Sequence, residues 1–175
     1  MNIPFHRPDI TQNEIGSVIE TMQSGWLTMG PKTSQFEIAF KKYIGCQFAI
    51  SVNSATAALH LALNAVGVKN DDEVIIPTNT FIATAEAVVY SGARPVLCDI
   101  EKKYHNIDVN LIEKLITPKT KAIIPVHFGG NSCEMEKINK LAKKYNLKII
   151  EDAAHALPSF YRNKKIGSFS DVVCF

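Results

Sequence analysis

Two helical patterns, each with one apolar face, begin the chain. The first covers residues 11–24, where Thr11 and Glu14 have the spacing of a capping box and Gly25 ends the periodic pattern. The second covers residues 34–44, with aromatic and small apolar residues on one side. The stretch between them, GWLTMGP, has no regular period. We expect these two helices to precede a sheet.

After Gly45 the pattern changes to short apolar runs that alternate with helical segments. The predicted strands cover residues 48–52, 73–77, 95–100, 122–126, 147–152 and 171–175. The predicted helices between them cover residues 55–66, 80–90, 108–116 and 132–145. Continuous apolar strands separated by helices are typical of a parallel sheet covered on both faces. The sequence therefore predicts a three-layer α/β/α fold with a mostly parallel sheet.

Composition and charge exclude several classes of function. A chain of 175 residues with 46% hydrophobic content can bury one substantial core. Its 19 basic and 17 acidic residues are spread along the chain, so we expect no nucleic-acid partner. No apolar run approaches the roughly 20 residues that cross a bilayer, and the N-terminus lacks the apolar core of a signal peptide. We therefore expect a cytoplasmic protein without a membrane segment.

The four cysteines lie far apart in the sequence. Neither a CxxC redox pair nor a zinc knuckle can be drawn from their spacing. We expect these cysteines to be reduced and buried, and we expect no metal site.

Ligands of such sheets bind beyond the carboxyl ends of the strands, so the residues after each apolar run are the candidates. The first run is followed by N-S-A-T-A-A, which leads directly into a helix. A helix N-terminus presents free N–H groups and a positive dipole end, which suits a phosphate. Alternatively, Ser54 or Thr56 only caps the helix. The glycine patterns of dinucleotide and P-loop sites are missing from this segment.

Aromatic and histidine side chains follow two other predicted strands. Phe81, in PTNTFIAT, could face a planar ligand, although an aromatic at this spacing is more often part of ordinary packing. His127, in PVHFGG, is expected to line or shape the site.

A carboxylate follows the predicted strand at residues 147–152. Asp152, in IIEDAAH, needs a cationic or hydrogen-bonding partner there. It could keep a pyridinium nitrogen protonated, while His155 fixes the carboxylate or contacts the ring substituents. The alternatives are a helix N-cap for Asp152 and a core position for His155. A metal site on this pair is disfavoured because further ligands are missing.

Seven segments, in this order, resemble the DegT/DnrJ/StrS family of nucleotide-sugar aminotransferases. They are GWLTMGP, SVNSATAALHLAL, DEVIIPTNTFIATAEAV, GARPVLCDI, IIPVHFGG, IIEDAAHA and GSFSDVVCF. The match runs from about Ile3 to Phe175. The resemblance implies the aspartate-aminotransferase-like fold, type I of the pyridoxal 5'-phosphate (PLP) enzymes. It also implies a homodimer with the active site at the subunit interface.

The resemblance further implies which residues bind the cofactor. Ala55 and Thr56, beside Ser54, match the phosphate-binding positions, and Phe81 matches the aromatic that stacks on the pyridine ring. These implied roles agree with the phosphate seat and the planar-ligand contact inferred from the residues themselves.

The resemblance assigns the remaining site residues in the same way. Asp152 matches the partner of the ring nitrogen, and His155 matches the position near the ring hydroxyl. Trp26 and Thr28, in GWLTMGP, match the border of the sugar site and are expected to contact the substrate.

One departure from the family concerns the lysine that binds the cofactor covalently, which follows the VVCF-like strand in family members. No lysine of this sequence matches it, and Lys164 and Lys165 lie in YRNKKIG, which resembles a hairpin turn. We expect residues 1–46 to form an N-terminal helical segment. Residues 47–175 would form the PLP-binding large domain, ending before that lysine, with the C-terminal small domain absent.

The resemblance implies a reaction. The complete polypeptide would transfer an amino group, typically from glutamate, to a keto-sugar nucleotide in the biosynthesis of amino sugars or surface polysaccharide such as lipopolysaccharide. The 175 residues alone are expected to be inactive without the lysine. The alternative is a non-catalytic module of the same fold that binds or pairs. An oxidoreductase with a dinucleotide-binding sheet ranks far behind, because the glycine fingerprint is missing.

Overall fold

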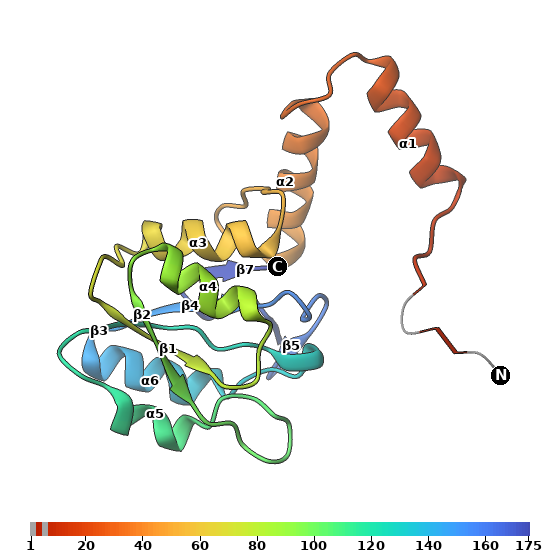
Figure 1. The fold of residues 1–175 in the computed structure, drawn as a ribbon. Helices are drawn as coiled ribbons and strands as arrows, with labels where there is room; N and C mark the ends of the chain where they lie inside the picture. The colour runs from red at the N-terminus through yellow and green to blue at the C-terminus, as the bar shows by residue number, and fades with distance from the viewer. Residues whose placement is uncertain (1–2, 5–6) are drawn as a thin grey trace. The chain divides into compact units, whose positions relative to one another are not determined.

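A five-stranded parallel sheet carries most of the structure, a computed structural model that describes residues 3–4 and 7–175 (Figure 1). The order of the strands is β2-β1-β3-β4-β7. Their bounds are Glu73–Pro77 (β1), Arg94–Cys98 (β2), Thr120–Ile123 (β3), Lys148–Asp152 (β4) and Val172–Cys174 (β7). The predicted parallel sheet is confirmed.

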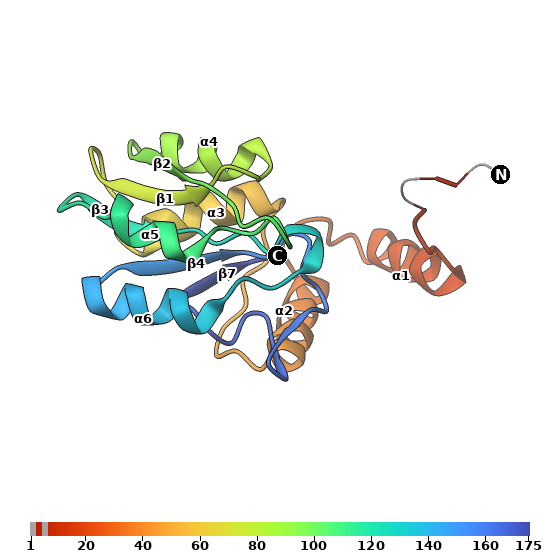
Figure 2. The ribbon, with the colours of Figure 1, turned by 90° about the horizontal axis from the view of Figure 1, so that it is seen from below.

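Helices cover both faces of this sheet, as Figures 1 and 2 show. On one face lie α3 (Ala55–Ala65) and α4 (Ile82–Tyr90), and on the other lie α5 (Val109–Leu115) and α6 (Met135–Tyr145). A short 3-10 turn, η1 (Phe128–Gly130), precedes α6. The predicted three-layer α/β/α architecture is therefore confirmed.

Strand residues supply two separate cores because successive side chains point to opposite faces. Ile75 and Ile149 pack in the core that contains α5 and α6. Val74 and Ile150 pack in the core that contains α3 and α4. The interior strand β1 is buried along its whole length, as expected of a parallel strand covered on both sides.

The described chain divides into two compact units, and the sheet belongs to the second, formed by residues 44–46 and 52–175. The first unit comprises residues 1–43 and 47–51 and contains α1 (Gln12–Gln23) and most of α2 (Pro31–Ile44). The described residues do not include residues 1–2 and 5–6. These four residues belong to the predicted N-terminal segment 1–46 and to the N-terminus that was examined for a signal peptide.

The predicted capping box at the start of α1 is present. The backbone N–H of Thr11 donates to the Glu14 carboxylate at 2.6 Å, and the Thr11 hydroxyl accepts from the N–H of Asn13 at 3.2 Å. The second helix begins at Pro31, earlier than predicted, because proline suits the first helical position, where no N–H donor is required.

The predicted strand at residues 48–52 is wrong. Phe48 and Ile50 are 76% and 77% exposed, and no described residue pairs with this segment as a strand. The backbone N–H of Ser51 donates instead to the carboxylate of Glu37, at 2.8 Å. An apolar run forms a strand only where a neighbouring strand accepts its hydrogen bonds, and the run itself does not reveal whether a neighbour exists.

The hairpin suggested by YRNKKIG is confirmed. Strands β5 (Phe160–Tyr161) and β6 (Lys164–Lys165) pair antiparallel. The two residues between them, Arg162 and Asn163, have φ angles of 44° and 63°, the conformation that a tight two-residue turn requires.

Three of the four cysteines, Cys98, Cys133 and Cys174, are buried thiols. Burial raises the pKa of Cys98 to about 11 and the pKa of Cys174 to about 12. Only Cys46 is partly accessible. Among the residues that the structure describes, no helix is both long enough and apolar enough to span a bilayer.

A buried carboxylate joins the starts of three sheet elements. Glu73, 3% exposed at the start of β1, accepts a hydrogen bond from the Thr117 hydroxyl at 2.7 Å and pairs with Arg94 of β2. The bond from Thr117, and then the bond from Arg94, lowers the pKa of Glu73.

We predict that Glu73→Gln lowers the thermal midpoint by a few degrees near neutral pH, because one charge-assisted bond is lost. A lowered folded-state pKa stabilises the protein above about pH 4.3, the unfolded value, and this stabilisation is lost as the pH falls through the folded value. The difference between the two proteins should therefore shrink in acid. Thermal unfolding from pH 7 to pH 3 measures it, with the exposed Glu134→Gln as the control. A difference independent of pH would contradict this role.

Candidate functional site

A pocket opens at the carboxyl edge of the sheet within the second unit. It is lined by the first turns of α3 and α4 and by the segments after β3 and β4. Five residues that the sequence singled out line it together: Ala55, Thr56, Phe81, Asp152 and His155. His127 also lines the pocket, as predicted. Segments up to 100 residues apart meet here because parallel strands end at one edge.

The N-terminus of α3 forms one end of the pocket. Ser54 is the helix cap, and its hydroxyl accepts from the N–H of Ala57 at 3.1 Å. No hydrogen bond within the described residues uses the N–H of Ala55 or Thr56. Two backbone donors and the positive dipole end are thus available to an anion. Ser54 itself caps the helix and does not line the pocket.

The carboxylate of Asp152 is fixed by hydroxyl groups. Thr84, buried within α4, donates to Asp152 Oδ2 at 2.8 Å, and the Thr80 and Thr84 hydroxyls are 2.6 Å apart. Because Thr84 gives its one proton to the carboxylate, Thr80 is the donor in the pair of hydroxyls. The N–H of Ala154 is a weaker donor to Oδ1, at 3.3 Å.

Asp152 is therefore a buried carboxylate held by neutral donors. Among the described residues it forms no ion pair. A buried carboxylate of this kind favours a cationic partner, because hydroxyls alone replace only part of its lost hydration. A turn follows β4, so the alternative role of Asp152 as a helix cap is wrong.

Aromatic side chains lie around the carboxylate. Phe81 occupies the cap position of α4 and is 74% exposed, although it lines the pocket. His155 is also exposed, so the alternative that places it in the core is wrong. The rings of His155 and Phe128 lie edge to face with centroids 6.2 Å apart. An exposed aromatic face beside a buried carboxylate suits a flat cationic ring.

Trp26 and Thr28 belong to the first unit, where they line a separate cleft together with Glu20 and Lys32. The indole N–H of Trp26 donates to the carbonyl of Met29 at 2.8 Å. Both side chains are exposed.

Sequence reasoning missed Thr80 and Thr84. The sequence shows only that the two threonines are four residues apart at the start of a mostly apolar helical pattern, and this spacing does not identify their partner. A hydroxyl on a buried helix face requires a partner, and here the partner is Asp152. The described residues contain no group of three or more histidine, cysteine or acidic side chains that could hold a metal ion.

Known proteins match nearly the whole chain. It is 46% identical to the spore coat polysaccharide biosynthesis protein SpsC of Bacillus subtilis, over 99% of this chain and 44% of SpsC. PseC of Helicobacter pylori, an aminotransferase involved in the biosynthesis of pseudoaminic acid, has a similar structure. Its TM-score is 0.92 at 37% identity, over 98% of this chain and 47% of PseC.

A structure with a bound cofactor is similar as well. NtdA of Bacillus subtilis, solved with bound pyridoxamine phosphate (PMP), matches with a TM-score of 0.83 at 36% identity, over 94% of this chain and 38% of NtdA. The chain thus spans less than half the length of each of these three proteins. The sequence profile of the DegT/DnrJ/EryC1/StrS aminotransferase family matches residues 8–175, and the chain belongs to this family.

Proposed function

We propose that this chain carries the cofactor pocket of a PLP-dependent aminotransferase that acts on a keto-sugar nucleotide, with glutamate as the amino donor. The observation that carries the proposal is the Asp152 carboxylate, buried in a pocket without a cationic partner among the described residues. The sugar substrate is supported by the descriptions of SpsC and PseC, which concern polysaccharide and pseudoaminic acid biosynthesis.

The pocket residues fit PLP in three respects. The N–H groups of Ala55 and Thr56 suit its phosphate, and the exposed ring of Phe81 suits its flat face. Asp152 suits its protonated ring nitrogen, since that nitrogen supplies the positive charge that the carboxylate lacks. His155, beside Asp152 in the pocket, is assigned to the ring hydroxyl.

Bound PLP supplies an electron sink that stabilises negative charge on the carbon next to the amino nitrogen. The chain's own residues keep that sink effective. Asp152 would hold the proton at the ring nitrogen, and Thr84 fixes the carboxylate by donating to Oδ2 at 2.8 Å. Phe81 would lie against the bound ring and shield it from water, which would strengthen the interaction with Asp152.

The reaction also requires an amine that moves a proton on the substrate carbon. No lysine lies among the described residues that line the pocket. We assign this role to a lysine that follows these 175 residues in the complete polypeptide.

The complete enzyme is proposed to be a homodimer, with Trp26 and Thr28 at the sugar. Exposed apolar side chains on the sheet-covering helices support the association. They include Leu61 of α3 and Val89 and Tyr90 of α4, each more than half exposed. The rings of Tyr90 and His60 contact each other across the two helices, with centroids 6.2 Å apart.

The chain is expected to bind pyridoxamine 5'-phosphate. This ligand is used in place of PLP because it has no aldehyde group that could react with surface lysines. Asp152→Asn should weaken this binding roughly 10- to 100-fold, because a charge-assisted hydrogen bond contributes about 1.5–3 kcal/mol. Isothermal titration calorimetry measures both affinities. Asp99→Asn is the matched control, since Asp99 directly follows β2 at the same edge of the sheet without lining the pocket. Equal affinities of Asp152→Asn and the unmodified chain would contradict the proposed role.

The 175-residue chain should show no amino transfer from glutamate to a keto-sugar nucleotide even when PMP is bound, because its pocket lacks a lysine. Chromatographic detection of 2-oxoglutarate and of the aminated sugar nucleotide tests this. Sustained turnover by the purified chain would show that another group moves the proton and would overturn the assignment to a later lysine.

A further inference from the structure

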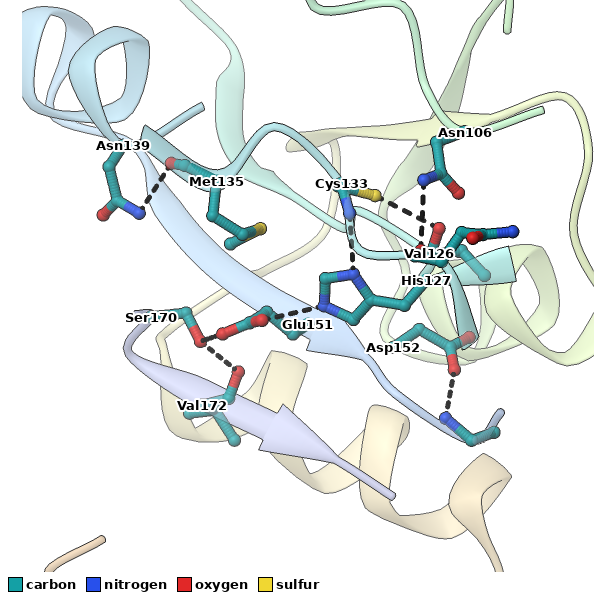
Figure 3. A network of polar contacts seen from close by, with 12 residues as sticks. Asn106, Val126, His127, Cys133, Met135, Asn139, Glu151, Asp152, Ser170 and Val172 are labelled. Carbon is teal, nitrogen blue, oxygen red and sulfur yellow. Dashed lines mark hydrogen bonds and ion pairs between the residues drawn. The ribbon is translucent and has the colours of Figure 1, made fainter. Parts of the chain in front are cut away.

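A buried network of polar side chains lies on the face of β4 opposite to Asp152 (Figure 3). His127 and Glu151 are both fully buried, and His127 Nε2 lies 2.8 Å from Glu151 Oε2. The Ser170 hydroxyl lies 2.5 Å from the other carboxylate oxygen, and 3.1 Å from the carbonyl oxygen of Val172. The network joins the end of β4 to the segment after β3 and to the start of β7.

The histidine ring is fixed through both nitrogens. The backbone N–H of Cys133 donates to His127 Nδ1 at 3.1 Å, so Nδ1 carries no proton. The proton is therefore on Nε2, which donates to Glu151. Both ring nitrogens are thus engaged inside the protein, which fixes the orientation of the His127 ring.

This anchor acts next to the candidate cofactor residue. Glu151 and Asp152 are consecutive in β4, so their side chains point to opposite faces of the sheet. The main chain continues the link, because the N–H of His127 donates to the carbonyl of Asp152 at 3.0 Å. The N–H of Asp152 donates to the carbonyl of Pro125 at 2.9 Å. The backbone of Asp152 is thus tied to the segment that carries His127.

Asn106 fixes the other end of that segment. Its side-chain oxygen accepts from the N–H of Phe128, and its amide group donates to the carbonyl of Asn131, both at 3.1 Å. The residues that follow His127 are therefore held by a second buried polar side chain, seen in Figure 3.

Apolar residues could fill the space of a buried His–Glu pair with equal or greater stability, since burying ionisable groups is costly. Apolar side chains do not provide directional hydrogen bonds, which hold β4 and the segment after β3 in one relative position. We propose that Glu151 and His127 are positioning residues that hold Asp152 at its place in the pocket. The importance of this positioning for function rests on the proposed role of Asp152 in binding the cofactor. The anchoring of the Asp152 backbone does not depend on that role.

Two variants of Glu151 test the anchoring without any cofactor. Glu151→Gln keeps an oxygen that accepts from His127 and an amide that donates to Ser170, whereas Glu151→Leu has similar size without polar atoms. Amide hydrogen exchange is followed by NMR at His127 and Asp152. We expect exchange at these two amides at least tenfold faster in Glu151→Leu than in Glu151→Gln. Amides of β1 should exchange at equal rates in the two variants.

Two outcomes would overturn the anchoring. One is equal exchange rates of the two variants at His127 and Asp152. The other is exchange in β1 of Glu151→Leu that is faster by the same factor, which would indicate a general loss of stability. If Glu151→Leu does not fold, Ser170→Ala removes one bond of the network. It should accelerate exchange at Asp152 more than in β1, and uniform or unchanged exchange would contradict the proposal.

Calorimetry with PMP tests the link to the pocket. Glu151→Leu should bind PMP several-fold more weakly than Glu151→Gln, and equal affinities would refute the positioning of Asp152 for the cofactor. If the unmodified chain binds no PMP, the proposed function fails and the positioning for the cofactor fails with it. The exchange comparison still decides whether the network anchors Asp152.

Discussion

The common direction of the five strands is the constraint on which the rest of the structure depends. Parallel strands place all their carboxyl ends at one edge, so residues from α3, from the segment after β3 and from β4 meet in one pocket. The same geometry gives β4 two chemically different faces at its end. Asp152 turns toward the pocket, and its neighbour Glu151 turns toward the core that contains α6. One strand end thus supplies both the candidate cofactor ligand and its anchor.

Most of the parallel sheet could be predicted from apolar periodicity, because each of its five strands includes or adjoins a short apolar run next to an amphipathic or apolar helix. The run at residues 48–52 has the same composition and forms no strand, since Ser51 donates to a helix side chain instead. Strand formation depends on a pairing partner elsewhere in the chain, which local composition does not specify. The start of α2 differs from the predicted start at residue 34, because Pro31 suits the first position of a helix.

The candidate site was predictable where a residue follows a strand. Asp152 and Phe81 were found in this way, whereas the first turn of α3 was found from the apolar run at residues 48–52, although that run forms no strand. All of them line one pocket. Thr84 and Glu151 were not found, because their importance depends on contacts across 68 and 24 residues of sequence. Such contacts follow from how helices and strands pack, and not from local spacing. The roles of the site residues toward a cofactor remain predictions.

A crystal structure of this chain with pyridoxamine 5'-phosphate tests the central claim most directly. The account predicts that the phosphate accepts hydrogen bonds from the N–H groups of Ala55 and Thr56, that the ring lies against Phe81 and that the ring nitrogen pairs with Asp152. A ligand bound elsewhere, or one whose ring nitrogen points away from Asp152, would contradict it.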